Sequence, residues 1–297
     1  MRLPIQSPVS CRQYVLRVVN GWEEWEWDES LFRGSAEYYD RGRLPNSPGL
    51  ADAFESALEL DRTASLLDVG CGPGTVALRL AHLFEQVVGV DADEGMIDEA
   101  RRRSTEQGAR NAHWVRMRAE HLPGDLGRFR VVTFAASFHW MDRPAVAAAV
   151  RGMLDPSGVV VHVDNRDHDS LAPSLLPPVP RDDLDRLRRQ YLGPDRRAGA
   201  SIRNSSPSDE DEVFRAAGFV GPEVVVVPDG RDVSRRVDDV VAEVFSMSST
   251  APHLFSDRKT SFETDVRDAL EASAGSGGQF GVRLPDNELK IWRPVRA

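Results

Sequence analysis

The chain has little of several residue types that mark particular classes of protein. Its 297 residues include only two cysteines, Cys11 and Cys71, and no CxxC pair. This argues against a structural zinc site or a redox dithiol and suits a reducing compartment. No apolar run approaches the roughly 20 residues that a membrane span requires, and the N-terminus lacks the pattern of a secretory signal. We therefore predict a cytoplasmic protein that has no membrane partner.

Positive charge is scarce as well. Asp and Glu number 47 against 37 Lys and Arg, a formal net charge of −10, and lysine occurs only at Lys259 and Lys290. Non-specific binding to nucleic acids needs a basic face, because counterion release supplies most of the affinity. The charge balance therefore argues against a nucleic-acid partner. Hydrophobic residues at 41% and charged residues at 28% predict an ordinary packed core.

Short β-branched runs alternate with helical patterns through the first half of the chain. Strands are expected at 65–69, 86–90, 112–117, 129–135 and 159–163, and helices at 75–84, 94–106 and 145–154. This alternation predicts an α/β fold with a doubly wound, mostly parallel sheet.

Composition divides the chain into four predicted segments. These are an N-terminal arm at 1–33, a core at 34–163, a proline-rich cap insertion at 164–207, and a C-terminal part of the core with additional lid helices at 208–297. The arm carries Trp22, Trp25 and Trp27 among acids. These tryptophans could form an aromatic lid or a homodimer contact; alternatively, the arm docks loosely or stays disordered.

A glycine-rich turn follows the first predicted strand. Its glycines are Gly70, Gly72 and Gly74, a G-x-G-x-G spacing, whereas dinucleotide enzymes prefer G-x-G-x-x-G. Asp68 precedes the turn and suits a ligand with a cationic amine and a sulfonium. Asp91 ends the next strand, where an acid can accept hydrogen bonds from both ribose hydroxyls. Together these features disfavour an NAD-dependent dehydrogenase; the alternative is a structural loop with a solvated Asp91.

Four segments carry a family resemblance: 68–74, 88–91, 119–123 and 137–140. Through them the chain resembles the class I methyltransferases, and within these the trans-aconitate methyltransferase-like group of small-molecule enzymes. The resemblance covers roughly residues 34–160. It implies a seven-stranded Rossmann-like sheet with an inserted helical cap, S-adenosylmethionine as cofactor and a small-molecule acceptor.

The resemblance also implies a set of cofactor-binding residues. They are Asp68, Gly70, Gly72, Gly74, Asp91, Ala92, Met96, Ala119, Glu120 and Ala135, with Tyr39 and Arg43 closing over the cofactor. Gly70 and Gly72 would border the methionine part and Asp91 would hold the ribose, while Met96 would flank the adenine. Many relatives have an acid where this chain has Arg118, so the predicted contact to the adenine amino group moves to Glu120.

The acceptor side is predicted from the segment after the fourth strand. A methyl sulfonium is already activated, so the protein must mainly align the acceptor and exclude water. A hydroxyl acceptor also needs a base, and His139 stands at the edge of the sheet where ligands bind. His139 could instead only pack or fix a loop. Phe138 and Trp140 are expected to form the wall of the substrate site, although Trp140 could be ordinary packing.

A polar run follows the fifth strand. It consists of His162, Asp164, Asn165, Asp167, His168 and Asp169. Such residues could hold a divalent metal that orients an acceptor. Metal-dependent relatives also need an acid after the fourth strand, and residues 135–137 offer none. We therefore predict a polar loop and no metal.

The resulting functional prediction is methyl transfer to a small organic acceptor, at oxygen in preference to nitrogen or carbon. The alternative is a cofactor-binding protein without transferase activity, or a cofactor-assisted cyclase or isomerase. A cofactor site can be kept while the chemistry changes, because function resides in the site and not in the fold.

Overall fold

The five strands of the predicted core lie side by side in one sheet. A computed structural model describes residues 28–166, 175–199, 201–202, 209–275 and 277–295. In chain order the strands are β1 (Ser65–Val69), β2 (Gln86–Asp91), β3 (Ala112–Arg116), β4 (Phe129–Ala135) and β5 (Leu154–Arg166). All neighbouring pairs among them are parallel. β1 lies inside the sheet with four of its five residues buried, as expected of an apolar strand covered on both faces.

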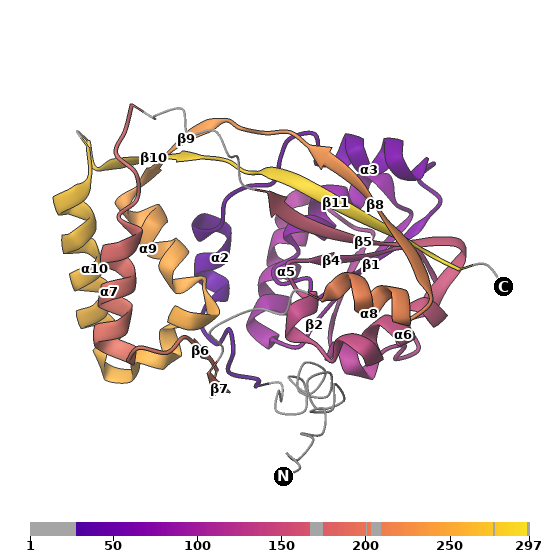
Figure 1. The fold of residues 1–297 in the computed structure, drawn as a ribbon, viewed down its shortest axis with the longest axis horizontal. Helices are drawn as coiled ribbons and strands as arrows, with labels where there is room; N and C mark the ends of the chain where they lie inside the picture. Colours follow the sequence, from indigo (N-terminus) through magenta and orange to yellow (C-terminus); the bar gives the residue numbers. More distant parts are fainter. Residues whose placement is uncertain (1–27, 167–174, 200, 203–208, 276, 296–297) are drawn as a thin grey trace, which may run out of the picture.

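Two further strands complete the sheet. Its order is β3-β2-β1-β4-β5-β11-β8 (Figure 1), and β11 (Asp286–Pro294) pairs antiparallel with β5 and with β8 (Phe219–Val227). This confirms the predicted seven-stranded, mostly parallel, doubly wound fold. From β1 the chain first builds outward through β2 and β3, and then in the opposite direction through β4 and β5. The carboxyl ends of β1 and β4 therefore flank the point where such sheets bind ligands.

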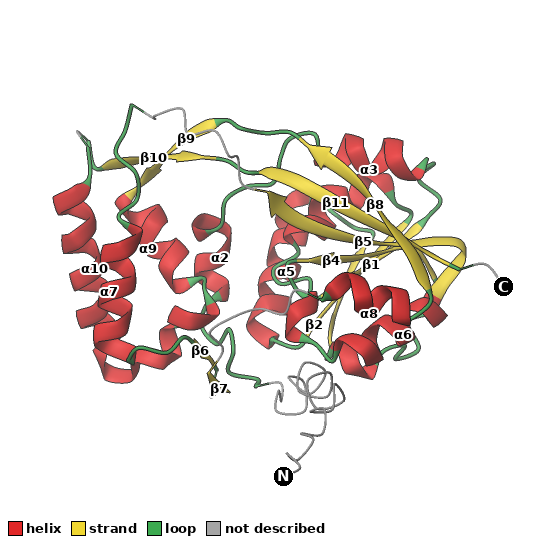
Figure 2. Ribbon diagram, viewed as in Figure 1, coloured by secondary structure: helices red, strands yellow, loops and turns green. Residues whose placement is uncertain are grey.

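Helices cover both faces of the sheet (Figure 2). They are α3 (Leu50–Leu58), α4 (Thr75–Leu80), α5 (Glu94–Gln107), α6 (Arg143–Met153) and α8 (Glu210–Ala216). Phe54 of α3, Val76 of α4 and Ile97 of α5 share one hydrophobic core, whereas Val146 of α6 and Phe214 of α8 belong to a second. One core lies on each face, so each βα unit packs where the doubly wound pattern predicts.

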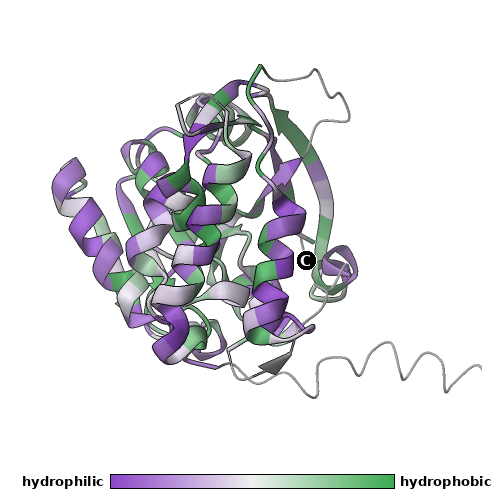
Figure 3. Ribbon diagram, turned by 90° about the vertical axis from the view of Figure 1, so that its left-hand side faces the viewer, coloured by the Kyte–Doolittle hydropathy of each residue, from purple (hydrophilic) through white to green (hydrophobic). Residues whose placement is uncertain are grey.

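A group of helices stands beside the sheet, and we call it the helical unit. It contains α2 (Ala36–Gly42), α7 (Arg181–Leu192), α9 (Val237–Phe245), the 3-10 segment η6 (Pro252–Arg258) and α10 (Lys259–Ser273). A third hydrophobic core joins these elements, and its residues include Leu184, Phe245, Phe255 and Phe262. Figure 3 views the molecule from this side and shows hydrophilic and hydrophobic residues mixed along the helices, as expected of amphipathic helices.

The helical unit is built from separate parts of the sequence. α2 precedes the core, α7 comes after β5, and α9 to α10 lie between β9 (Asp232–Arg236) and β10 (Gln279–Arg283). These two strands pair as a ribbon that leads from β8 and β11 to the helices (Figure 1). Helix α7 from the predicted cap thus packs with α9 and α10, the predicted lid helices. The boundaries of the four predicted segments stay predictions.

Helix α2 is locked against α9. Gly42 has no side chain, and a Cβ atom there would lie 2.5 Å from the backbone of Ala242. The buried Arg235 reinforces the contact, because its Nη2 donates to the carbonyl oxygens of Gly42 at 2.9 Å and of Asp239 at 2.7 Å. The position of α2 is therefore set by the helical unit, although its sequence adjoins the core.

Two predictions concern the N-terminal arm and membranes. Trp22, Trp25 and Trp27, for which a lid or homodimer contact was one of two alternatives, lie outside the described residues. Within the described part of the chain, no helix combines the length and the apolar character needed to cross a bilayer.

Candidate functional site

The glycine turn and the end of β2 are joined by hydrogen bonds to the side-chain carboxylate of Asp91. Gly70, Gly72 and Gly74 all have positive φ angles, of 67°, 54° and 75°. Asp91 accepts from the amide of Gly72 through Oδ2 at 2.8 Å and from the amide of Asp93 through Oδ1 at 2.9 Å. The carboxylate at the tip of the second strand thereby fixes the turn that follows the first.

The three glycines serve different purposes. A Cβ atom on Gly70 would lie 2.6 Å from Ser137, and one on Gly74 would lie 2.5 Å from the ring of Trp114. At Gly72 an added Cβ would meet no atom within 4 Å. Gly70 and Gly74 are therefore required by close packing, whereas Gly72 leaves space open for a ligand.

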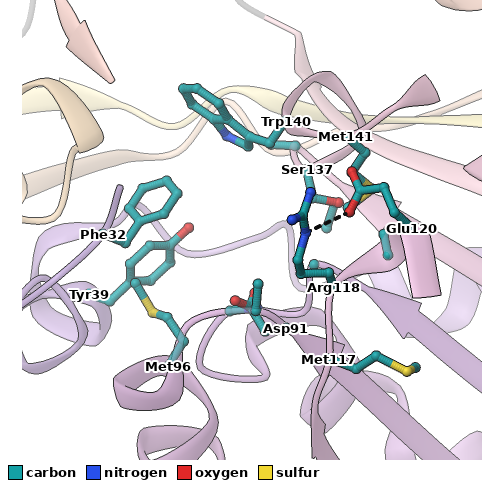
Figure 4. Close-up of a pocket in the computed structure, with 16 residues that line it drawn as sticks. Phe32, Tyr39, Asp91, Met96, Met117, Arg118, Glu120, Ser137, Trp140 and Met141 are labelled. Atoms are coloured by element: carbon teal, nitrogen blue, oxygen red, sulfur yellow. Dashed lines mark hydrogen bonds and ion pairs between the residues drawn. The ribbon is translucent and has the colours of Figure 1, made fainter. Parts of the chain in front are cut away.

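A cavity opens above this turn (Figure 4). Phe32 and Tyr39 stand on one side, Trp140 stands above, and Asp91 lies at the floor (Figure 4). The cavity is lined by Phe32, Tyr39, Gly70, Gly72, Asp91, Ala92, Met96, Met117, Arg118, Ala119, Glu120, Ala135, Ala136, Ser137, Trp140 and Met141.

The structure brings most of the predicted cofactor residues together at this cavity. Those that line it are Tyr39, Gly70, Gly72, Asp91, Ala92, Met96, Ala119, Glu120 and Ala135. Arg43, Asp68 and Gly74 lie just outside. Arg43 stacks on the ring of Tyr39, with 4.8 Å between Cζ and the ring centroid, and donates to the carbonyl of Ser246 at 2.8 Å. Arg43 therefore anchors Tyr39 to the helical unit and does not itself face the cavity.

Asp68 is a buried acid beside the site. It is 1% exposed, and its Oδ1 accepts from the hydroxyl of Thr133 at 2.7 Å, while its buried Oδ2 has no hydrogen-bond partner among the described residues. Burial raises the pKa of Asp68 to about 6, although the hydrogen bond from Thr133 lowers it. An acid held in this way with an unused oxygen fits a nearby cationic group.

Asp91 shares this electrostatic character. Burial raises the pKa of Asp91 to about 6, against the lowering effect of the hydrogen bonds from the amides of Asp93 and Gly72. The charge on Asp91 also raises the pKa of Asp68. Within the described part of the chain, no cationic side chain forms an ion pair with the buried Asp68 or the half-buried Asp91, which suits a positively charged ligand.

The opposite wall of the cavity contains an ion pair (Figure 4). Arg118 Nε lies 3.3 Å from Glu120 Oε2, and Glu120 Oε1 accepts from the amide of Asp142 at 2.9 Å. Met96, across the cavity, is 2% exposed. Its amide donates to the side chain of Asp93, which caps helix α5, at 2.9 Å. Met96 and Glu120, both predicted to contact the adenine, thus lie on opposite sides of the cavity (Figure 4).

The turn η4 (Phe138–Trp140) contains the three residues from which the acceptor side was predicted, and it separates them. Phe138 is 2% exposed and packs among core rings, at 4.8 Å from Phe134 and 5.0 Å from Phe214. It thus belongs to the core and does not form the cavity wall that the sequence predicts. Trp140 does line the cavity and meets Phe32 edge-on at 5.9 Å. The ring of His139 lies 4.8 Å from that of Trp140, and His139 is not among the residues that line the cavity.

Comparison with known proteins bears on this geometry. Residues 66–158 match the family of methyltransferase domains. Over 121 residues the chain is 31% identical to a protein-L-isoaspartate O-methyltransferase of Azorhizobium caulinodans. This alignment covers 40% of this chain and 53% of that protein. Over 112 residues it is 35% identical to an uncharacterized methyltransferase of Mycobacterium bovis, covering 38% of this chain and 56% of that protein. The chain thus spans about half the length of these relatives.

Residues 66–158 form a class I methyltransferase domain. Among solved structures, the methyltransferase CcbJ of Streptomyces caelestis shares the fold, with a TM-score of 0.50 and 16% identity over 91% of this chain and all of that one. Class I methyltransferases use S-adenosylmethionine as methyl donor, which confirms the predicted cofactor. These matches do not single out the trans-aconitate methyltransferase-like group, so that finer assignment stays a prediction.

The cavity also has lining residues that the sequence did not predict. They are Phe32, Met117, Arg118, Ala136, Ser137 and Met141. Ser137 stood inside a recognised segment, and its hydroxyl donates to the carbonyl of Val69 at 2.6 Å, linking the ends of β4 and β1. Phe32 gave no signal, since nothing local in the sequence shows that the chain before α2 returns to the cavity.

The polar run after β5 is partly described. Asp164 Oδ2 lies 3.5 Å from Lys290 Nζ, and Asn165 accepts from Asn287 at 3.0 Å, whereas 167–169 lie outside the described residues. His162 and Asp164 meet Glu210, with ligand-type atoms within 4.8 Å of one another. The sequence did not predict Glu210 here. The absence of a metal stays a prediction.

Proposed function

We propose that this chain transfers the methyl group of S-adenosylmethionine to a small organic acceptor, at an oxygen atom. The observation that carries the proposal is the cavity at the switch point of the sheet, where Gly72 leaves open space and the half-buried Asp91 forms the floor. A donor of the size and charge of S-adenosylmethionine fits this combination.

The residues around the cavity divide the cofactor between them. Asp91 would accept hydrogen bonds from the ribose, and the unused Oδ2 of Asp68 would face the cationic methionine end. Met96 and the wall formed by Ala119 and Glu120 would hold the adenine. When bound, the cofactor supplies an electrophilic methyl group on a sulfonium.

The chain's own contribution to the reaction is placement and dehydration. Phe32, Tyr39 and Trp140 close one side of the cavity with aromatic surface, which excludes water from a reaction between a methyl group and a hydroxyl. His139, beside Trp140, is the proposed base that takes the proton of the hydroxyl.

The direct test is transfer of label. The protein is incubated with methyl-labelled S-adenosylmethionine and fractionated metabolite extracts, and labelled products are separated and identified. Label on a hydroxyl-derived methyl ether or ester would support the proposal. Cofactor binding with no labelled product would favour the binding-protein alternative, and a rearranged product without label would favour a cyclase or isomerase. The methyltransferase family does not favour that last alternative.

A further inference from the structure

A second cavity shares Tyr39 with the cavity above the glycine turn, which we call here the cofactor cavity. It is formed by the end of α2 and the loop that follows, by α4 and by α5, where α2 comes close to α5 (Figure 1). Its volume is about 460 Å³, within the usual range for small-molecule sites. The charged residues that line it are Asp40, Arg43, Arg79 and Arg103, so we call it the arginine cavity.

The two neighbouring cavities carry opposite charge. The cofactor cavity is lined by Asp91, Glu120 and Arg118 and has the buried Asp68 beside it. The arginine cavity has three cations against the single acid Asp40, in a chain whose formal net charge is −10. A guanidinium group presents planar donors that match a carboxylate or a phosphate. The lining of the second cavity therefore suits an oxyanion.

Neutral groups hold two of the arginines in place. The side chain of Arg103 on α5 is 11% exposed, and its Nη1 donates to the carbonyl of Pro73 at 3.1 Å and to the hydroxyl of Thr75 at 3.2 Å. Arg79 on α4 donates through Nη2 to the carbonyl of Pro48 at 2.8 Å. These partners orient each guanidinium group without neutralising it. The positive charge therefore remains available to a ligand, and the donors are already positioned.

The countercharge in the arginine cavity is incomplete. Within the described part of the chain, the one acid that pairs with these arginines is Asp40, whose Oδ1 lies 2.7 Å from Nη2 of Arg103 and whose side chain is 62% exposed. Arg43 stacks on Tyr39 and donates through Nη2 to the carbonyl of Ser246, while its buried Nε has no hydrogen-bond partner among the described residues. A buried donor without an acceptor is costly, so Arg43 retains an unused donor beside an unneutralised charge.

We propose that the arginine cavity binds the anionic group, a phosphate or a carboxylate, of a small molecule other than the cofactor. Arg43, Arg79 and Arg103 are its binding residues. The inference goes beyond the proposed function, because it concerns a second binding site and no step of methyl transfer. Tyr39 lines both cavities and carries Arg43 on its ring, so the bound anion lies next to the cofactor site. The anionic group belongs either to the acceptor or to a separate molecule, and the recognition chemistry is the same for both.

The experiment measures binding of inorganic phosphate to the full chain without cofactor. Phosphate is titrated at constant ionic strength, because salt screens such interactions, and the arginine Nε–H signals are followed by NMR. Arg103→Gln is compared with Arg102→Gln, a matched control on the same helix whose guanidinium group is exposed and pairs with Glu99 and Glu106. Arg103→Gln should weaken phosphate binding by about 10–100-fold, since it removes charged donors. Arg102→Gln should bind phosphate as the unmodified protein does.

A second comparison changes the affinity in the opposite direction at an exposed position, where the fold is not at risk. Asp40→Asn removes the acid that competes with phosphate for Arg103, so binding should tighten by about two- to fivefold. Asp98→Asn is the matched control, because Asp98 is similarly exposed, pairs with Arg101 on α5 and lines neither cavity. Phosphate binding should be unchanged in Asp98→Asn.

S-adenosylhomocysteine, the demethylated cofactor, separates this site from the cofactor site. Phosphate should still bind in its saturating presence. If it does not, the arginines hold the carboxylate of the cofactor itself and the inference is wrong. The inference also fails if Arg103→Gln and Arg102→Gln bind phosphate equally. It fails again if Arg103→Gln weakens phosphate and S-adenosylhomocysteine in the same proportion, since Arg103 would then only hold the glycine turn through Pro73.

The source of the anionic group is distinguished in the methyl-transfer assay. Phosphate that raises the KM for the acceptor identifies the group as part of the acceptor, because the two then compete for the arginines. An unchanged KM identifies a separate anion. The phosphate titrations need no methyl transfer, so a failure of the proposed function leaves their outcome readable.

Discussion

The cofactor side and the acceptor side of the cavity are built in different ways. On the cofactor side, neighbouring segments fix one another: Asp91 binds the amides of Gly72 and Asp93, and Asp93 in turn caps α5 at Met96. On the proposed acceptor side, Phe32 and Trp140 meet although they are far apart in the sequence. The predicted cofactor residue Tyr39 lines the cavity with them and is held by Arg43, which bonds Ser246, 203 residues away. The first side depends on local βα units, whereas the second depends on the helical unit.

This difference separates binding from chemistry. A substitution on the cofactor side should change affinity for S-adenosylhomocysteine, the demethylated cofactor, with little effect on any step that follows binding. A substitution on the acceptor side should change turnover while cofactor affinity is preserved.

The largest effect is expected at His139. If it is the base for a hydroxyl acceptor, His139→Ala should lower turnover by roughly 10²–10⁴-fold with nearly unchanged affinity for S-adenosylhomocysteine. His139→Gln keeps hydrogen bonding but loses basicity, so it should be almost as slow. Steady-state kinetics and calorimetry on both variants provide the measurement. Rescue by glutamine would mean that His139 only positions the acceptor, and weakened cofactor binding would place it on the cofactor side instead.

Gly72 should show a large effect on binding alone. In Gly72→Ala the new methyl group would point into the open space of the cavity, and crowding of about 1–3 kcal/mol corresponds to about 5–150-fold weaker binding of S-adenosylhomocysteine. Gly108→Ala is the matched control, because Gly108 also has a positive φ, of 68°, and an added Cβ there also meets nothing within 4 Å. Both variants should lose similar thermal stability, and equal binding by both would remove Gly72 from the site.

Asp91 should make cofactor binding depend on pH. Its pKa in the free protein is about 6, and the ribose hydroxyls prefer the ionised carboxylate as acceptor. Affinity should therefore be constant above that value and fall as pH drops through it, by up to about tenfold per pH unit. Calorimetry with S-adenosylhomocysteine between pH 5 and pH 8 measures this, and Asp91→Asn should bind more weakly at pH 8 but with a flat profile. A dependence that survives in Asp91→Asn would belong to Asp68, whose pKa is also about 6.

The smallest effect on chemistry is expected at the contact between α2 and α9. Gly42→Ala would force its methyl group against the backbone of Ala242, which should cost about 1–3 kcal/mol in the free energy of unfolding. Gly152→Ala, on the exposed side of α6 where an added Cβ meets nothing, should be neutral or stabilising by up to about 1 kcal/mol. Chemical denaturation measures both. Equal stabilities for the two variants would mean that α2 shifts freely on α9.

The sequence predicted the sheet well because each parallel strand is a buried apolar run bounded by turn residues. β1 and β4 have the predicted bounds, while β5 begins at Leu154, earlier than expected, through a stretch with a proline and a glycine. β9 was missed because Asp232–Arg236 carries too few apolar residues to read as a strand; its pairing with β10 supplies what its composition lacks.

The candidate site was predictable to the extent that it follows strand ends. Asp91, Ala119 and Ala135 each come directly after or at the end of a strand, so topology alone brings them together. Phe138 and His139 show the limit of that reasoning, because neighbours in a 3-10 turn point in different directions. Glu210 could not be predicted as a partner of His162, since only the packing of α8 on the sheet brings the two together.

The attachment of α2 to α9 has a consequence for the order in which the molecule assembles. Arg41 bonds Asp239, 198 residues further along the chain, so this contact must wait until most of the polypeptide has been synthesised. The strands β1 to β4 need no such wait, because their pairings join nearby segments, and closing long loops slows folding. In pulse-labelled hydrogen exchange during refolding, amides of β1 to β4 should become protected before those of α2. The aromatic wall at Tyr39 would then be the last part of the cavity to form.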